Sequence, residues 1–158
     1  MKRVLLFIMI FTTLDLHAQV QNNYMTNDEI QEFLDSMIVH KNQFIGKTMG
    51  DIYLLFEQVR LPIRYFSIDE TSAWIDPDGK TYLTDVILYT EDLEDMNDGK
   101  EYFEIRFELD IPKIDSGLFY RSIPAETYNM WWNAFKQQTK EMEIKDIFYQ
   151  KLILPLHH

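Results

Sequence analysis

The alternation of apolar and polar residues over positions 101–111 constrains the fold of this chain more than any other feature. Every second residue is apolar, and most of the residues between are charged. A period of two predicts a β-strand with one buried face and one solvated face. The residues expected on the buried face are Phe103, Ile105, Phe107, Leu109 and Ile111. Those expected on the solvated face are Tyr102, Glu104, Arg106, Glu108 and Asp110.

Two amphipathic helices are predicted before this strand. Thr26 with Glu29, and Thr48 with Asp51, have the spacing of capping boxes, in which two side chains satisfy the first free amides of a helix. An apolar stripe at helical spacing follows each cap, and Pro62 prevents the second helix from continuing. The stripes consist of Ile30, Phe33, Leu34, Met37 and Ile38 in the first helix and Ile52, Leu55, Phe56 and Val59 in the second.

Several shorter strands and one later helix complete the predicted fold. Strands are expected over 63–68, 73–75, 81–90 and 118–123, with a turn at 76–79 and a hairpin tip within 91–100. A helix is expected from Pro124 to about Lys140, and a last strand over 142–154, for which a helix is the alternative. The sequence therefore predicts an α+β domain: two N-terminal helices and one later helix on a mainly antiparallel sheet of about five to six strands.

The first eighteen residues have the pattern of a secretory signal peptide. Lys2 and Arg3 precede an apolar run over 4–11, and Ala18 provides a small residue before the expected cut. The run is too short to cross a bilayer, which needs roughly 20 residues. We therefore expect residues 1–18 to be removed, and residues 19–158 to form one periplasmic or secreted domain with no membrane insertion.

Composition excludes several classes of function. The chain has no cysteine, so it cannot form disulfides, zinc–thiolate sites or a thiol nucleophile. It carries 26 Asp and Glu against 15 Lys and Arg, for a net charge of −11. Such a charge disfavours binding to nucleic acid and to anionic lipid, and it favours a basic protein partner.

No motif predicts catalysis, a metal site or a cofactor. Gly46-Lys47-Thr48 is similar to the end of a phosphate loop, but Lys41 stands where the first glycine belongs. His40 is expected at a helix end, where a cation interacts favourably with the helix dipole. The acidic segments do not fit the EF-hand pattern. We therefore expect a non-enzymatic protein with no metal and no cofactor.

Two features are candidates for binding a partner. The first is the acidic segment 91–101, and the second is the adjacent pair Trp131 and Trp132 on the later helix. Adjacent residues lie about 100° apart around a helix, so one indole is expected in the core and the other at its margin. The residues predicted to contact a partner protein are Asp92, Glu94, Asp95, Asp98, Trp131 and Trp132.

The segment from Gly46 to Ile52, followed by Leu55, Phe56 and Pro62, resembles the entry to the second helix of SmpA/OmlA-like envelope domains. It is also similar to β-lactamase-inhibitor-like modules. The resemblance implies two helices against an antiparallel sheet and a role in binding protein. This chain departs from the lipidated members because it has no cysteine, and no functional residue is transferred from them.

The sequence thus favours an exported protein-binding domain, of the inhibitor or immunity type, that acts through an acidic and aromatic surface. The alternative is a small-ligand or glycan-binding module with a pocket between sheet and helices, lined by Trp74, Tyr82, Phe107 or Tyr128. A third possibility is a carboxylate-based hydrolase, which requires two acids roughly 5–10 Å apart across a cleft.

Overall fold

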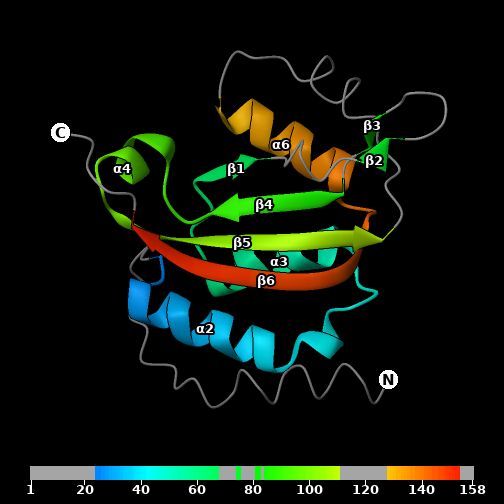
Figure 1. Ribbon diagram of the computed structural model, residues 1–158, viewed down its shortest axis with the longest axis horizontal. Coiled ribbons are helices and arrows are strands. Elements are labelled where there is room, and N and C mark those ends of the chain that lie inside the picture. The colour runs from blue at the N-terminus through cyan, green and yellow to red at the C-terminus, as the bar shows by residue number, and fades with distance from the viewer. Residues whose placement is uncertain (1–23, 68–73, 76–80, 83, 111–127, 154–158) are drawn as a thin grey trace.

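The computed structural model describes residues 24–67, 74–75, 81–82, 84–110 and 128–153. They form an α+β fold in which helices cover an antiparallel sheet, as predicted (Figure 1). The helices are α2 (Asn27–Val39), the 3-10 helix η1 (Lys41–Gln43), α3 (Met49–Val59), α4 (Leu93–Asn97) and α6 (Tyr128–Thr139). The strands are β1 (Tyr65–Ser67), β2 (Trp74–Ile75), β3 (Thr81–Tyr82), β4 (Asp85–Tyr89), β5 (Glu101–Asp110) and β6 (Glu143–Ile153).

The main sheet has four described strands in the order β1-β4-β5-β6, and each neighbouring pair is antiparallel. The prediction of one sheet with five to six strands is therefore wrong for this part of the chain. The strand expected over 81–90 divides in two. Its first residues form β3, which pairs with β2 in a separate two-stranded sheet, while β4 joins the main sheet. The strand expected over 118–123 lies outside the described residues.

β5 is the long alternating strand that the sequence predicts. It pairs with β4 on one side and with β6 on the other, and a register shift falls between Glu108 and Leu109. Phe103, Ile105 and Phe107 are fully buried. Tyr102 departs from the expected pattern because it is also buried, on the opposite face, where its ring lies 6.1 Å from that of Tyr89.

Helices α2, α3 and α6 pack with the apolar face of the sheet around one core. Figure 1 shows α3 behind the strands, with α2 below it and α6 above it. In α2 and α3, residues of the predicted apolar stripes pack into this core. In α6, Phe135 does so. The buried residues of the first two helices include Ile30, Leu34, Met37, Ile52, Leu55 and Phe56. Within the described residues, no helix has the length and hydropathy needed to cross a membrane.

Both predicted capping boxes are present. Thr26 accepts a hydrogen bond from the Glu29 amide while the Glu29 carboxylate accepts one from the Thr26 amide. Thr48 and Asp51 make the same exchange at the start of α3. These reciprocal bonds fix where each helix begins, because they satisfy amides that have no partner within the helix.

A short helix, α4, stands where the sequence predicted a hairpin tip. Asp92 caps this helix by accepting a hydrogen bond of 2.9 Å from the Asp95 amide. Met96 is buried, so the helix has an apolar anchor to the domain. The Asn-Asp-Gly sequence that suggested a tight turn instead ends the helix, with Gly99 at a φ of 78°.

Residues 46–50 bind the start of β6 through their backbone. Gly46 donates to the Ile144 carbonyl at 2.8 Å, Met49 to Met142 at 2.8 Å, and Gly50 to Lys140 at 2.9 Å. A phosphate loop needs such amides to face its ligand. These three amides have carbonyl partners, so Gly46-Lys47-Thr48 forms a helix start and not a nucleotide site. The last strand is confirmed as β6, and the alternative of a C-terminal helix is wrong.

We predict that Gly50→Ala destabilises the fold, although alanine is normally the better helix former. A Cβ at Gly50 would lie 3.0 Å from the Lys140 carbonyl oxygen, a backbone atom that can move only with the turn between α6 and β6. Overpacking of this kind costs about 1–3 kcal/mol. Urea unfolding measures the change, with Ser36→Ala on the exposed side of α2 as the control. A Gly50→Ala protein as stable as wild type would contradict the close backbone approach.

Candidate functional site

The two adjacent tryptophans of α6 both pack against Phe66 of β1. The Trp131 and Trp132 rings lie 5.9 Å and 5.5 Å from the Phe66 ring. Both are partly buried against the core, and the indole N–H of Trp131 is buried. The expected division into one core indole and one marginal indole is therefore not observed. Neither side chain protrudes as an interface anchor would.

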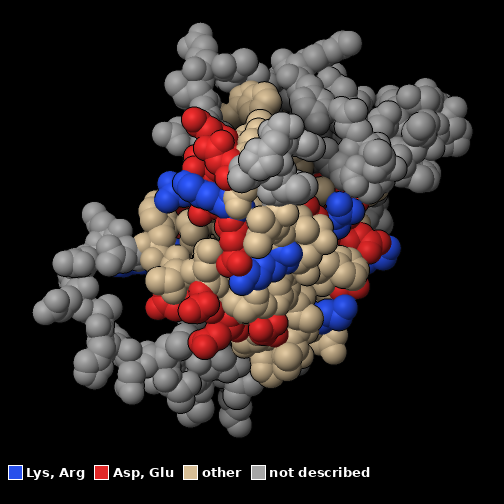
Figure 2. All heavy atoms as spheres, turned by 60° about the vertical axis from the view of Figure 1, so that its left-hand side comes forward, with Lys and Arg blue, Asp and Glu red and all other residues tan. Residues whose placement is uncertain are grey.

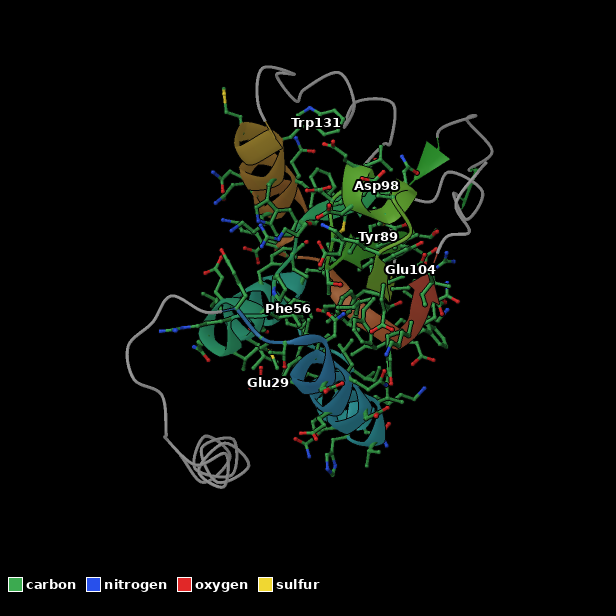
Figure 3. All side chains as sticks on the ribbon, turned by 90° about the vertical axis from the view of Figure 1, so that its left-hand side faces the viewer. Glu29, Phe56, Tyr89, Asp98, Glu104 and Trp131 are labelled. Carbon is green, nitrogen blue, oxygen red and sulfur yellow. The ribbon has the colours of Figure 1, made fainter. Side chains whose placement is uncertain are left out.

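Trp132 contributes to a cleft of about 290 Å³ between α3 and α6. Figure 3 labels Phe56 on α3 and Trp131 on α6, the two helices that bound it. The apolar walls come from Tyr53, Phe56, Leu61 and Trp132. Tyr24, Glu57, Arg60 and Ile63 complete the lining. The cleft thus combines aromatic walls with a few polar groups, which is the usual composition of a small-ligand site.

The end of α3 forms one side of this cleft. The Arg60 amide donates to Glu57 at 3.3 Å, and the Leu61 amide donates to Phe56 at 2.9 Å. This is the bonding pattern of a Schellman motif, which requires a left-handed residue that is usually glycine. Here the residue is Arg60, with φ 60° and ψ 35°. Within the described residues it is the one non-glycine residue with positive φ.

The hydroxyl of Tyr53 is used to hold the cleft wall. It lies 2.7 Å from Thr139 Oγ1, which in turn donates to the Phe135 carbonyl at 2.8 Å. Burial raises the pKa of the Tyr53 phenol well above its ordinary value. The hydroxyl therefore stays protonated and donates to Thr139. The Tyr53 ring meets the Trp132 ring edge to face at 5.5 Å, which fixes both walls.

Basic side chains stack on the aromatic rings of the cleft. The Arg64 guanidinium lies 5.1 Å from the Tyr24 ring, and Lys136 Nζ lies 5.3 Å from the Trp132 ring. Lys136 also pairs with Glu57, at 2.9 Å. Both cation–ring distances are within the range of a cation–π interaction. Basic side chains thus lie beside the rings of the cleft, although the chain as a whole is acidic.

The acidic residues predicted as a binding site lie together on α4 and at its two ends, whereas the two tryptophans belong to α6. Asp92 caps the helix, and Asp95 is paired with Lys100. Glu94 and Asp98 are exposed to solvent. Figure 2 shows that acidic and basic side chains are interspersed over this side of the molecule. The prediction that these acids and the two tryptophans bind a partner protein stays a prediction.

The pKa values of two neighbouring carboxyls in this segment, Glu91 and Asp95, are shifted in opposite directions. Burial raises the pKa of Glu91, and the adjacent Asp95 carboxyl raises it further. The Lys100 ammonium lowers the pKa of Asp95. The two carboxyls are four residues apart on one segment, whereas a glycosidase places its acids across a cleft. Within the described residues, no group of three His, Asp or Glu side chains could hold a metal ion.

The pocket residues predicted from the sequence differ from those that line the cleft. Phe107 is fully buried in the core and does not line the cleft. The side chains of Trp74, Tyr82 and Tyr128 lie outside the described part of the structure. His40 caps the end of α2, as expected. Sequence reasoning missed Tyr53 and Arg60, although Pro62 marks the helix end that places Arg60 at the cleft.

Comparisons with known proteins found no similarity. No protein family matches the sequence, and no curated protein or solved structure matches the chain. The resemblance to SmpA/OmlA-like domains stays a prediction.

Two replacements of Arg60 should separate the free-energy cost of its left-handed backbone from the contribution of its side chain. Both Arg60→Gly and Arg60→Ala remove the guanidinium, but only glycine adopts the left-handed region without cost. We expect the glycine variant to be about 1 kcal/mol more stable than the alanine variant. Thermal unfolding compares the two. Equal stability would mean that Arg60 is not held in the left-handed conformation.

The Glu91 carboxyl gives a pH-dependent prediction. Its folded pKa is raised, so ionisation destabilises the fold as pH rises, and the protonated form is the stabilising one. Glu91→Gln keeps the protonated shape at every pH. At neutral pH we expect the variant to be more stable by roughly a few tenths of a kcal/mol, because the group is only partly buried and solvent screens its charge. In acid, below the ordinary carboxyl pKa, the difference should vanish. Thermal unfolding across pH measures it, and a difference independent of pH would refute the assignment.

Proposed function

We propose that this chain is an exported, non-enzymatic binding domain that holds a small ligand or glycan in the cleft between α3 and α6. The observation that carries the proposal is the cleft itself, about 290 Å³ with walls formed by Tyr53, Phe56 and Trp132. Binding pockets for small molecules have volumes of roughly 300–1,000 Å³ and mostly apolar walls. The cleft lies just below that range, which suits a ligand of one or two rings.

The chemistry of the walls favours a ring-shaped ligand. Aromatic side chains offer flat apolar surfaces on which another ring, or the apolar face of a sugar, can stack. Trp132 is held by its contacts with Tyr53 and with Phe135, whose ring lies 5.8 Å away. A wall that is already fixed loses little conformational entropy on binding. The signal-like leader over 1–18 supports a periplasmic or secreted location for this activity.

A protein partner at α4 is the second candidate. Leu93 is 51% exposed there, beside the exposed carboxylates of Glu94 and Asp98. An apolar side chain flanked by acids would suit a basic partner of an inhibitor or immunity-type protein. This candidate ranks second because Asp92 and Asp95, two of its four predicted acids, already stabilise α4 and its ion pair with Lys100.

Ligand screening with matched variants tests the first proposal against the second. We expect Trp132→Leu to weaken ligand binding by about tenfold or more, since aromatic anchors typically dominate binding energy. The control is the double variant Glu94→Gln with Asp98→Asn, which should bind the ligand as wild type does. Calorimetry on panels of small molecules and glycans provides the measurement, with thermal unfolding to confirm that each variant folds. Binding lost in the α4 variant and kept in Trp132→Leu would exclude the cleft.

A further inference from the structure

β6 (Glu143–Ile153) is the last strand on its side of the described sheet, so one of its edges has no neighbouring strand there (Figure 1). An edge strand presents backbone amides and carbonyls that can pair with another chain. The first part of this edge is already closed. Ile144 exchanges two hydrogen bonds of 2.8 Å with residues 46–47, and the Ile147 amide donates to the Asp146 carboxylate at 2.8 Å. The open stretch therefore follows Ile147.

The register of the sheet shows which backbone groups point out of this edge. The backbone of Phe103 faces β4, because its carbonyl accepts a hydrogen bond from the residue that follows β4. Successive residues of a strand face opposite sides, so Glu104 faces β6, where it lies opposite Gln150. Gln150 faces β5 in turn, and its neighbours Tyr149 and Lys151 face the open edge. Within the part of the chain that the structure describes, neither backbone forms a hydrogen bond on that side.

The charges that usually protect an edge strand are directed away from this edge. Lysines along an edge discourage a second strand from pairing with it. Lys151 pairs with Glu101 on β5 at 2.8 Å, and its Nζ lies 5.7 Å from the centroid of the Phe103 ring. Lys145 pairs with Glu108, also on β5. Both lysines thus reach across the sheet toward β5 and leave the open edge accessible to another strand.

The strand is electrically neutral, unlike the chain as a whole. β6 contains two acids and two lysines, so its net charge is zero, against −11 for the chain. Phe148 and Ile153 are 48% and 62% exposed. Two copies of the strand can therefore approach each other with little local repulsion, and burial of these apolar side chains would favour their contact.

We propose that a second copy of this chain pairs with β6 along this edge, in the antiparallel direction and about a two-fold axis at Gln150. Gln150 is the midpoint of the open stretch 147–153. A two-fold contact requires one surface to be complementary to itself. In this register, Phe148 of one copy lies opposite Leu152 of the other, so an exposed aromatic ring meets an aliphatic side chain.

The same register satisfies the open backbone groups. Tyr149 of one copy lies opposite Lys151 of the other, and both turn their amides and carbonyls to the shared edge. Opposite residues of this kind exchange two hydrogen bonds in an antiparallel pair. Ile147 lies opposite Ile153, which adds an apolar contact on the other face of the strand. The pairing joins two sheets into one and does not involve the cleft between α3 and α6.

A single introduced cysteine tests the register, because the chain has no cysteine of its own. A residue on the axis faces its own copy at a Cα separation of about 4.5 Å, which a disulfide can span. Gln150→Cys should therefore form a covalent dimer in the presence of oxidised glutathione. Phe148→Cys is the control on the same face of the strand. Its two copies would lie roughly 13 Å apart, too far to bond.

Two substitutions at Lys151 test the backbone pairing. Lys151→Ala removes the ammonium and keeps the amide, whereas Lys151→Pro also removes the amide that faces the open edge. Proline is tolerated at such a position because the ladder to β5 does not use that amide. Analytical ultracentrifugation should show that the wild type and Lys151→Ala form dimers as concentration rises, and that Lys151→Pro stays monomeric. Circular dichroism confirms folding, and ligand binding in the cleft should be unchanged in both variants.

Several outcomes would overturn the proposal. These are a wild type that is monomeric at every concentration with no cross-link in Gln150→Cys, a dimer that persists in Lys151→Pro, or equal cross-linking of Phe148→Cys. A monomer whose amides over 147–153 shift when a basic peptide of alternating valine and lysine is added would replace the second copy with a basic partner. If Lys151→Pro does not fold, the two cysteine variants decide the question.

Discussion

The backbone bonds between residues 46–50 and residues 140–144 join the start of α3 to the segment between α6 and β6. β6 follows α6 almost directly, so the bond from the Gly50 amide to the Lys140 carbonyl ties the first turn of α3 to the end of α6. These bonds give the amides of Gly46, Met49 and Gly50 carbonyl partners. They fix the two helices side by side, and the cleft lies where their aromatic side chains meet.

Much of the fold could be predicted from local sequence, whereas the site could not. The capping boxes at Thr26 and Thr48 and the alternation of β5 depend on neighbours a few residues away, so the sequence displays them directly. The division of the strand expected over 81–90, and the helix at α4, depend on pairing and packing that a local pattern does not contain. The cleft needs Tyr53, Arg60 and Trp132 to meet from separate elements, and Arg60 gave no signal beyond its position before Pro62.

Total charge proved a poor guide to the candidate site. The acidic composition suggested one acidic surface, yet Asp92 and Asp95 stabilise their own helix, and Figure 2 shows basic side chains among the acidic ones. The lining of the cleft carries one base and one acid, Arg60 and Glu57, and Arg64 and Lys136 stack on two of its rings. Screening makes such short-range charges decisive for a small ligand, while the net charge affects long-range encounters.

The most direct test of the account is an NMR titration that maps which backbone amides and indole N–H groups shift when a ligand found in the small-molecule and glycan panels binds. Binding in the cleft predicts shifts concentrated at Tyr53, at Arg60 and Leu61, and at the Trp132 indole, with α4 unchanged. Shifts concentrated on 92–98, with the end of α3 unchanged, would contradict the cleft and support a site on α4.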